Sequence, residues 1–448
     1  MVLRHTKIGV WGLGIVGKSL VQFLKSQGAH VSVLDTCISD EQKQLLIQQN
    51  ITVYDADKLT TFFSDNTYVI PSPGIDVTLF TIDTTKLLSE LDLFATFYKK
   101  PYIAITGTLG KTSITTLLSQ ALRTNNNSIF IGGNIGVGCC DAIIDQNCYD
   151  YAVLEVSSFQ TEKATLFSPQ LAIISNIFPN HLDRHETEQN YLKAKLTIIR
   201  NQQKDQIALV PISLADQLTR YKTASTLHCF SVQPPTKKQL ALLPKQSAAY
   251  WIEDNQIIRR HNNKTTSIYS IPAIHNHFEE NILIVASALD LLQQKFIFDL
   301  QKDTYLEHRK EFVATINGIN FINDSKSTVP EATLAALQAL PKMPTILFLG
   351  GISKGIDRQP LIKQLPLHIM HVICFGKEKE LLQQFLNQST ISYSTHDTLE
   401  NAFAYAITLA QPNMQILFSP AGASFDLFTD YKDRGKQFKK LVAKIKTP

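Results

Sequence analysis

Short apolar runs alternate with amphipathic stretches over about the first 95 residues of the chain. The run at residues 8–12 predicts a buried strand, residues 16–27 carry apolar side chains at helical spacing, and residues 30–35 predict the next strand. A strand, a helix and a second strand at this spacing form a parallel βαβ unit. The N-terminal segment therefore predicts a Rossmann-like domain.

A second series of apolar runs lies at residues 101–107, 151–158 and 171–177. Continuous apolar runs are typical of parallel strands that are covered on both faces. Alternating residues at 248–270 predict a small antiparallel sheet, and residues 281–295 predict a helix. We therefore expect a central domain built on a mostly parallel sheet.

A third series begins near residue 306. Two alternating segments flank Asn317-Gly318, which is the strongest short signal for a β-hairpin. Apolar runs at 345–351, 371–376 and 415–420 predict strands with helices between them. The length of 448 residues also favours about three domains. We expect an α/β protein of three domains, spanning residues 1–97, 98–305 and 306–448.

The composition narrows the class of protein. Hydrophobic residues make up 44% and charged residues 18% of the chain, and the formal net charge is +4. This mildly basic balance does not suggest a nucleic-acid partner. No run reaches the ~18 apolar residues of a membrane span. The six cysteines form no C-x-x-C pair, which argues against a zinc site, and so few suggest reduced thiols in the cytoplasm.

A glycine-rich turn at residues 12–17 (G-L-G-I-V-G) lies between the first predicted strand and helix. Its G-x-G-x-x-G pattern allows a tight turn and lets backbone N–H groups at the helix start approach a phosphate. Asp35 ends the next strand, where an acid could take ribose hydroxyls. The pattern alone is typical of NAD binding, but UDP offers the same pyrophosphate and a ribose, so both ligands stay open.

A second glycine-rich segment, Gly107-Thr108-Leu109-Gly110-Lys111-Thr112-Ser113, follows a predicted strand and opens a predicted helix. The backbone of such a loop cradles phosphates, Lys111 would reach the β- and γ-phosphate oxygens, and Thr112 would hold Mg²⁺. The common pattern has a glycine where this chain has Ile105, so the loop is the variant G-T-x-G-K-[ST]. We expect it to bind ATP in a central domain of the P-loop ATPase type.

Three further side chains suit metal chemistry. Glu155 ends an apolar strand at the sheet edge where ligands bind, and a buried acid there favours a cation as its partner. His181 follows the next strand, and Lys195 lies on a predicted helix. Taken alone, a histidine of this kind is more often a hydrogen-bonded loop residue, and such a lysine more often faces solvent.

The variant phosphate loop, E-V-S-S-F-Q (155–160), N-H-L-D-R-H (180–185) and Y-L-K-A-K (191–195) resemble the Mur ligase family in order and spacing. The loop is also similar to that of the related folylpolyglutamate synthases. The resemblance implies that Thr112 and Glu155 hold one Mg²⁺ and that His181 and a carbamylated Lys195 help to place a second. It also implies that ATP is the co-substrate.

The family carries an H-N motif before a helix of the central domain, and this chain has H-N-H-F-E-E-N at residues 275–281. Its spacing departs from the family pattern, so Asn276 and Asn281 both stay candidates for binding ATP. In the C-terminal segment, His308-Arg309 implies that Arg309 binds the ATP phosphates. Asp324, in N-D-S-K-S-T (323–328), is implied to bind the ATP ribose or to bridge the domains.

The resemblance also implies an amino-acid site in the C-terminal domain. The segment S-P-A-G-A-S-F-D (419–426) resembles the family members that add D-glutamate more than it resembles their siblings. Val329 replaces an asparagine that usually follows the N-D-S-K-S-T motif, so this edge of the site departs from the pattern. The implied amino-acid ligands are Lys326, Thr328, Lys354, Ser424, Phe425 and Tyr431.

A site for the nucleotide-linked precursor UDP-N-acetylmuramoyl-L-alanine is implied as well. Cys37 follows Asp-Thr here, where a basic residue is common, which removes one contact to uracil. The implied precursor ligands are Gly14, Ile15, Val16, Gly17, Asp35, Thr36, Ser72, Pro73, Gly74, Asn134, Ser157, Gln160 and His181.

The implied enzyme is a monomeric, cytoplasmic, amide-forming ligase of peptidoglycan precursor synthesis that uses D-glutamate. The precursor carboxylate would attack the γ-phosphoryl group of ATP, and the amine of D-glutamate would then displace phosphate from the acyl phosphate. Three alternatives stay open: another amino-acid ligase of the family, an NAD-binding sensor that uses residues 12–17, and a P-loop switch that uses residues 107–113. The implied catalytic residues are Lys111, Glu155, His181, Lys195 and Arg309.

Overall fold

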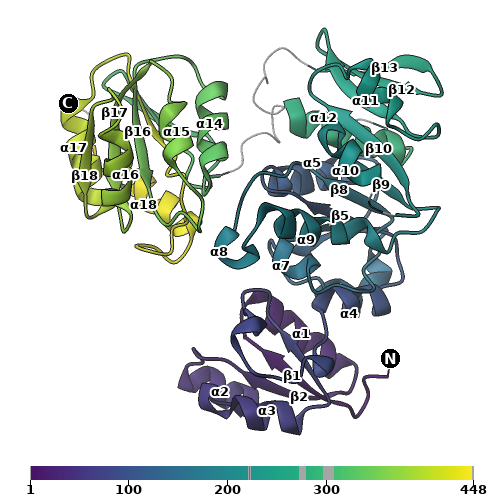
Figure 1. Ribbon diagram of the computed structural model, residues 1–448. Helices are drawn as coiled ribbons and strands as arrows, with labels where there is room; N and C mark the ends of the chain where they lie inside the picture. Colours follow the sequence, from purple (N-terminus) through teal and green to yellow (C-terminus); the bar gives the residue numbers. More distant parts are fainter. Residues whose placement is uncertain (1, 220, 222, 272–278, 296–306, 446–448) are drawn as a thin grey trace. The chain divides into compact units, whose positions relative to one another are not determined.

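The computed structural model describes residues 2–219, 221, 223–271, 279–295 and 307–445 (Figure 1). These residues group into two compact units. The first contains the described residues up to Ile177 and those from Gln189 to Lys295, and the second contains Phe178–Glu188 and the described residues from Glu307 onward. The three-domain α/β class is confirmed, and one sheet lies in each predicted domain segment.

The N-terminal sheet has four parallel strands in the order β3-β2-β1-β4, which suits a Rossmann-like domain. The helix after β1 forms because Leu20, Phe23 and Leu24 recur at helical spacing and are buried against the sheet. The elements are β1 (Lys7–Trp11), α1 (Ile15–Ser26), β2 (His30–Leu34), α2 (Asp40–Gln48), β3 (Thr52–Tyr54), α3 (Leu59–Asp65) and β4 (Tyr68–Pro71).

Helix α4 (Glu90–Phe97) connects the N-terminal sheet to the central sheet. Phe94 stacks on Tyr98 and meets Tyr102, the first residue of β5, edge to face. These rings belong to one continuous hydrophobic core that contains residues of both sheets. The N-terminal and central segments therefore share a core within the first unit, and the predicted bound near residue 97 stays a prediction.

The central sheet has nine strands in the order β13-β12-β11-β10-β9-β8-β5-β7-β6. Its strands are β5 (Tyr102–Thr106), β6 (Ile129–Gly133), β7 (Tyr151–Glu155), β8 (Leu171–Ile174), β9 (Ile207–Pro211), β10 (Thr226–Ser231), β11 (Ala249–Glu253), β12 (Gln256–His261) and β13 (Lys264–Ser270). Its helices are α5 (Lys111–Thr124), α6 (Asp141–Ile144), α7 (Ser158–Thr161), α9 (Glu188–Arg200), α10 (Ala215–Thr219), α11 (Lys237–Ala241) and α12 (Glu279–Leu291).

The prediction of a small antiparallel sheet at residues 248–270 is confirmed, and these strands belong to the central sheet. Strands β11, β12 and β13 do pair antiparallel with each other. Strand β11 also pairs parallel with β10, with Cys229 opposite Ala249, so the hairpin extends the central sheet. The pairing between β10 and β11 spans the connection at residues 232–248, and the alternation within residues 248–270 does not reveal it.

Strand β5 lies between β7 and β8, with parallel pairing on both sides. Strands β7 and β8 follow β5 in the chain but lie on opposite sides of it. Where chain connections diverge in this way, the carboxyl ends of the strands border a crevice that commonly binds ligands. The loops after β5, β6, β7 and β8 are therefore the ones to search for a site.

The C-terminal sheet has six strands in the order β14-β15-β19-β16-β17-β18. The predicted hairpin is confirmed, because Asn317 and Gly318 both have positive φ (53° and 75°), as a type I′ turn requires. The strands are β14 (Glu311–Ile316), β15 (Ile319–Asn323), β16 (Thr345–Gly350), β17 (Ile369–Phe375), β18 (Tyr393–His396) and β19 (Gln415–Phe418). The helices of the second unit are α8 (Leu182–His185), α14 (Pro330–Ala339), α15 (Gln359–Lys363), α16 (Lys379–Leu386), α17 (Leu399–Leu409) and α18 (Tyr431–Ala443).

Two general features complete the fold. All six cysteines are free thiols. Among the described residues, no helix combines the length and the apolar character needed to cross a lipid bilayer. The predicted bound near residue 305 lies outside the described residues.

Candidate functional site

The loop between β5 and α5 has the geometry of a phosphate cradle. Gly107 and Gly110 have φ values of 141° and 82°, which a residue with a side chain adopts only with strain. Lys111, the first residue of α5, donates to the carbonyl oxygens of Gly107 (2.8 Å) and Thr108 (2.9 Å). Thr112 and Ser113 follow in the first helical turn, where backbone N–H groups favour an anion.

Asn176, directly after β8, supports this loop and was missed in the sequence. Its Oδ1 accepts the backbone N–H of Leu109 at 2.8 Å, and its backbone carbonyl accepts the N–H of Thr108 at 2.9 Å. Ser175 Oγ donates to the carbonyl of Leu109 at 2.6 Å. The polar end of an apolar strand was the available signal, because such residues border the crevice of a parallel sheet.

A buried acid and a buried lysine lie beside the loop. Glu155 is 1% exposed, its Oε1 accepts from Asn134 Nδ2 at 2.8 Å, and its Oε2 has no hydrogen-bond partner among the described residues. Lys195 is 2% exposed, and its Nζ donates to Thr106 Oγ1 at 3.3 Å. Burial, and then the charge of Lys111, hold the pKa of Lys195 well below its usual value, while Glu155 opposes this shift. Lys195 therefore interacts electrostatically with both Lys111 and Glu155.

The buried residues around Glu155 form only part of a magnesium site by themselves. An unpartnered buried carboxylate oxygen calls for a cation or a donor. Among the described residues, however, no group of three or more His, Cys, Asp or Glu side chains could hold a metal ion. Mg²⁺ is commonly bound through one or two carboxylates together with substrate phosphates and water. Glu155 offers one such carboxylate, and the metal role of the Thr112 hydroxyl stays a prediction.

His181 is assigned to a different unit from the other predicted metal ligands. It has a left-handed backbone (φ 54°) at the start of α8, within Phe178–Glu188 of the second unit. In the same unit, the N–H of Asp183 donates to the carbonyl of Lys354 at 3.4 Å. The structure thus brings the segment of His181 to that of Lys354, and the metal role of His181 stays a prediction.

Of the two asparagines that are candidates for binding ATP, Asn276 lies outside the described residues. Asn281 lies against the phosphate loop, since a Cβ added at Gly110 would come within 2.8 Å of its Oδ1. The neighbouring Glu280 is hydrogen-bonded to Asn176, and burial raises its pKa to about 6. Asn281 therefore fits a nucleotide site better than its sequence context alone suggested.

The predicted precursor residues of the N-terminal domain lie at the carboxyl ends of β1, β2 and β4. Asp35 Oδ2 accepts the backbone N–H of Leu13, and its Oδ1 accepts that of Cys37 at 2.8 Å. Ser72 Oγ donates to the carbonyl of Gly12 at 2.9 Å. Both side chains therefore brace the glycine-rich turn. Gly14 precedes α1, which begins with Ile15, Val16 and Gly17. Thr36 follows Asp35 on the surface, and Pro73 and Gly74 follow Ser72.

The central precursor candidates lie on the loops after β6 and β7. Asn134 contacts Glu155 as described. Ser157 caps α7, and its backbone N–H and its hydroxyl donate to Gln160 Oε1 at 3.0 and 3.1 Å. Gln160 is 4% exposed. The structure thus brings Asn134, Glu155, Ser157 and Gln160 to one edge of the central sheet.

In the C-terminal domain, Asp324 is a buried bridge between loops. Its Oδ2 accepts from the hydroxyls of Ser327 and Ser419, and its Oδ1 accepts the N–H of Lys310. Burial raises the pKa of Asp324. Lys326 Nζ lies 3.6 Å from the ring centroid of Tyr431, a cation–π contact that positions both predicted ligands.

The other amino-acid candidates vary in exposure. Ser424 is buried, Phe425 is 71% exposed, Thr328 is half-buried, and Lys354 has a left-handed backbone (φ 55°). Arg309 is half-buried directly before Lys310. Apart from Arg309, which precedes β14, these residues follow the ends of β15, β16 and β19, which are adjacent strands of the C-terminal sheet.

Two buried arginines tie these loops together, and the sequence reasoning assigned no role to either. Arg434 donates from Nη2 to the carbonyl of Ser325 (2.7 Å) and from Nη1 to that of Gly422 (2.9 Å). Arg358 donates to the carbonyl of Gly350 (3.0 Å) and pairs with Glu378 (2.7 Å). Burial lowers the pKa of Arg434 to about 9, so it stays charged near neutrality.

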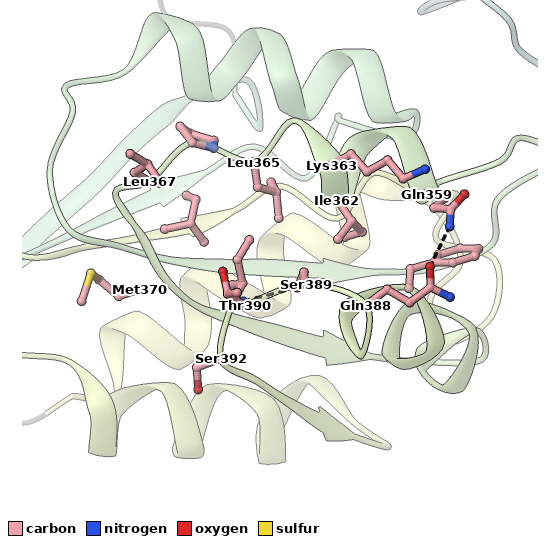
Figure 2. Close-up of a pocket in the computed structure, with 14 residues that line it drawn as sticks. Gln359, Ile362, Lys363, Leu365, Leu367, Met370, Gln388, Ser389, Thr390 and Ser392 are labelled. Atoms are coloured by element: carbon pink, nitrogen blue, oxygen red, sulfur yellow. Dashed lines mark hydrogen bonds between the residues drawn. The ribbon is translucent and has the colours of Figure 1, made fainter.

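A separate cavity of about 570 Å³ lies between α15, α16 and the loops that lead into β17 and β18 (Figure 2). Gln359 Nε2 and Gln388 Oε1, which are 3.0 Å apart, form a hydrogen bond at one end of it. The cavity opens at the amino-terminal edge of the C-terminal sheet, since Ile369 begins β17 and Ser392 precedes β18. None of the predicted site residues line it.

Family models match the chain in three consecutive segments. They are described as the MurD-like N-terminal domain of Mur ligases (residues 6–87), the Mur ligase middle domain (105–289) and the Mur ligase glutamate ligase domain (308–422). The UDP-N-acetylmuramoylalanine–D-glutamate ligase of Thermoanaerobacter pseudethanolicus is 33% identical to this chain over 465 aligned residues. The alignment covers 100% of this chain and 100% of that relative. The ligase of the same name from Geotalea daltonii is 32% identical, with 99% of this chain and 98% of the relative covered.

Solved structures share the fold at lower identity. MurF ligase from Thermotoga maritima, in complex with ADP, matches with a TM-score of 0.60 at 16% identity, covering 92% of this chain and 95% of that one. The UDP-N-acetylmuramate–alanine ligase MurC from the same organism matches with a TM-score of 0.57 at 19% identity, covering 99% of this chain and 100% of that one.

Proposed function

The chain belongs to the Mur ligase family, and on that basis we propose that it joins D-glutamate to UDP-N-acetylmuramoyl-L-alanine, with conversion of ATP to ADP and phosphate. The observation that carries this proposal is the similarity to D-glutamate ligases, which extends at 32–33% identity over the whole chain. The reaction belongs to peptidoglycan precursor synthesis, and the six free thiols suit a cytoplasmic location.

The first step is transfer of the γ-phosphoryl group to the precursor. A carboxylate oxygen of the alanine residue attacks the γ-phosphorus, the bond to the β-phosphate oxygen breaks, and ADP leaves. The new acyl phosphate provides the leaving group that a carboxylate lacks. Lys111, at the N-terminus of α5, and Arg309 stabilise the charge that develops on the phosphoryl oxygens.

The residues around Glu155 would hold magnesium. We assign Thr112 and Glu155 to one ion, and His181 and Lys195 to a second. Bound Mg²⁺ would neutralise charge on the phosphates and orient them. The unpartnered Glu155 Oε2 supports the first assignment.

Lys195 suits carbamylation. Its burial favours the neutral amine, which can attack CO₂; an N–C bond forms, a proton is lost, and the resulting carbamate offers anionic oxygens of the kind that Mg²⁺ prefers. A ¹³C NMR spectrum in ¹³C-bicarbonate should show a carbamate signal that disappears in Lys195→Arg. A spectrum of the wild-type protein without that signal would rule out the modification.

The second step forms the amide. The D-glutamate amine attacks the acyl carbon and loses a proton, a tetrahedral intermediate forms, and phosphate leaves with the bridging oxygen. We assign D-glutamate to the loops at the carboxyl ends of β15, β16 and β19, where Lys326, Thr328, Lys354, Ser424 and Phe425 lie. Their fixed spacing, set by Arg358 and Arg434, supports a preorganised amino-acid site.

The test is phosphate release with Mg-ATP and UDP-N-acetylmuramoyl-L-alanine, with D-glutamate, L-glutamate, L-alanine or L-lysine added separately. We expect release only with D-glutamate and none from Lys111→Ala. Dependence on another amino acid would keep the family and overturn the substrate. No release with any amino acid, from folded protein that binds ATP, would overturn the ligase activity.

A further inference from the structure

Glu90, the first residue of α4, is a carboxylate buried at the junction of the N-terminal and central sheets. It is 4% exposed. Its Oε1 accepts the backbone N–H of Cys139 at 2.9 Å, and its Oε2 accepts from Gln160 Nε2 at 3.1 Å. Burial raises the pKa of Glu90, and both hydrogen bonds oppose that shift. Because burying a carboxylate is costly, the contacts that this one makes need an explanation.

The contact with Gln160 sets the orientation of its side-chain amide. A carboxylate can only accept hydrogen bonds, so it fixes the NH₂ end of Gln160 toward Glu90. The carbonyl end of Gln160 then faces Ser157, whose N–H and hydroxyl donate to it. Glu90 thereby determines both ends of the amide that caps α7.

The contact with the backbone of Cys139 holds the loop after β6. Cys139 ends this loop, which closes on itself through the N–H of Gly133 and the carbonyl of Val137 (2.8 Å). At its other end, Asn134 donates to the backbone carbonyl and to Oε1 of Glu155, both at 2.8 Å. One carboxylate therefore braces two loops, those after β6 and β7.

A small cavity adds a connection to the N-terminal domain. Glu90 and Gln160 line it together with Pro71, at the end of β4, and Pro73, in the predicted precursor segment. Phe159 and Lys163 from the α7 region also line it. Glu90 thus lies where residues assigned to the precursor from two domains come together.

We propose that Glu90 is a positioning residue for the nucleotide-linked substrate, acting through Gln160 and the 134–139 loop. This inference rests on the proposed function, because it assigns Asn134, Ser157 and Gln160 to the precursor. Among the hydrogen bonds of the described residues, those of the Glu90 side chain end at Cys139 and Gln160, and none reaches the phosphate loop. The effect of Glu90 therefore falls mainly on binding of the precursor, because Asn134, at the far end of the loop, keeps its own two hydrogen bonds to Glu155 and so keeps that carboxylate in place.

The variant Glu90→Gln tests this with little change in shape. A glutamine offers one acceptor where Glu90 offers two, so Cys139 and Gln160 compete for it. If Gln160 turns over to adapt, the two donors of Ser157 lose their acceptor. We expect the KM for the precursor to rise about tenfold or more, with kcat and the KM for ATP changed less than about twofold.

Asp92 on the same helix provides the matched control. Its two oxygens accept from the N–H and hydroxyl of Thr165 and from the N–H of Leu166, away from the precursor residues. Asp92→Asn should lower the unfolding temperature and leave the KM for the precursor unchanged. Should Glu90→Gln fail to fold, Glu90→Asp replaces it, because a carboxylate shorter by one methylene cannot reach both donors.

The outcomes separate the two proposals. Wild-type protein that releases no phosphate with the precursor and D-glutamate would overturn the proposed function. Active wild-type protein with an unchanged precursor KM in the Glu90 variants would overturn the role of Glu90 alone. An equal rise in KM in Asp92→Asn would also overturn it, since anchoring of α4 would then be the cause.

Discussion

Asn134 donates a hydrogen bond to Glu155 Oε1 at 2.8 Å, which joins the loop after β6 to the end of β7. The second oxygen of the same buried carboxylate has no hydrogen-bond partner among the described residues. Asn134 thereby fixes the plane of the carboxylate and leaves Oε2 to serve another ligand. A carboxylate with one oxygen anchored and the other open suits the one or two carboxylates through which Mg²⁺ is commonly bound.

Replacing Glu155 by glutamine should separate catalysis from stability. We expect kcat to fall ~10²–10³-fold, because the variant lacks the charge that would hold a cation at the phosphates. In magnesium-free buffer the free energy of unfolding should change by no more than about 1 kcal/mol, because the glutamine keeps an acceptor for Asn134. Phosphate release and urea unfolding measure the two effects. A fully active variant would exclude Glu155 from the metal site.

Removing the side chain of Asn176 should weaken ATP binding. Its amide accepts the N–H of Leu109 and donates to the carbonyl of the same residue, so Asn176→Ala frees the phosphate loop. We expect the Kd for Mg-ATP, measured by calorimetry, to rise about tenfold. Gln202→Ala is the matched control, since Gln202 braces Pro169 and Ile207 at the other end of the same strands. Equal ATP affinities in the two variants would contradict this role.

Stability should depend on pH through His228 in β10. Its Nδ1 accepts the N–H of Ala248 at 2.9 Å, and burial lowers its pKa from 6.5 to about 4. Between these values the unfolded chain binds the proton more readily, so stability is lost as the pH falls from 6.5 to 4, by about 3 kcal/mol in total. Urea unfolding from pH 7.5 to 4.5 should show this slope.

His228→Asn gives the comparison, because an asparagine keeps an acceptor near Ala248 and does not titrate. The difference in unfolding free energy between wild type and variant should shrink as the pH falls. Glu280 has the opposite effect on stability, because its raised pKa lowers stability as the pH rises from 4.5 to 6. Both proteins contain Glu280, so its contribution cancels in the difference and that of His228 remains. A difference that is independent of pH would contradict the assignment.

Exchanging Arg434 for lysine should loosen the amino-acid loops. A lysine keeps the charge but cannot reach Ser325 and Gly422 together, as the planar guanidinium does. We expect the free energy of unfolding to fall by about 3 kcal/mol and the KM for D-glutamate to rise about tenfold. Arg260→Lys on β12, where the guanidinium contacts only Asn263 among the hydrogen bonds described, should change neither quantity. Similar effects of both exchanges would argue against a specific role.

Local patterns predicted much of the fold. Strand and helix periodicities marked β1, α1 and β5, and Asn317-Gly318 marked the hairpin, because these signals lie within a few residues of each other. Local patterns did not identify the buried polar residues that hold the loops of the site in place. Arg434 binds Ser325, which is 109 residues away, and Glu90 binds Gln160, which is 70 residues away. In the sequence each is one charged residue among many, and only the fold supplies its partners.

The most direct test of the central claim follows an oxygen atom. UDP-N-acetylmuramoyl-L-alanine, labelled with ¹⁸O in both carboxylate oxygens, would be incubated with Mg-ATP, D-glutamate and the protein, and the products analysed by mass spectrometry. Ligation through an acyl phosphate predicts a D-glutamyl product that keeps one labelled oxygen and a phosphate that carries the other. Unlabelled phosphate, or labelled phosphate without the D-glutamyl product, would contradict it.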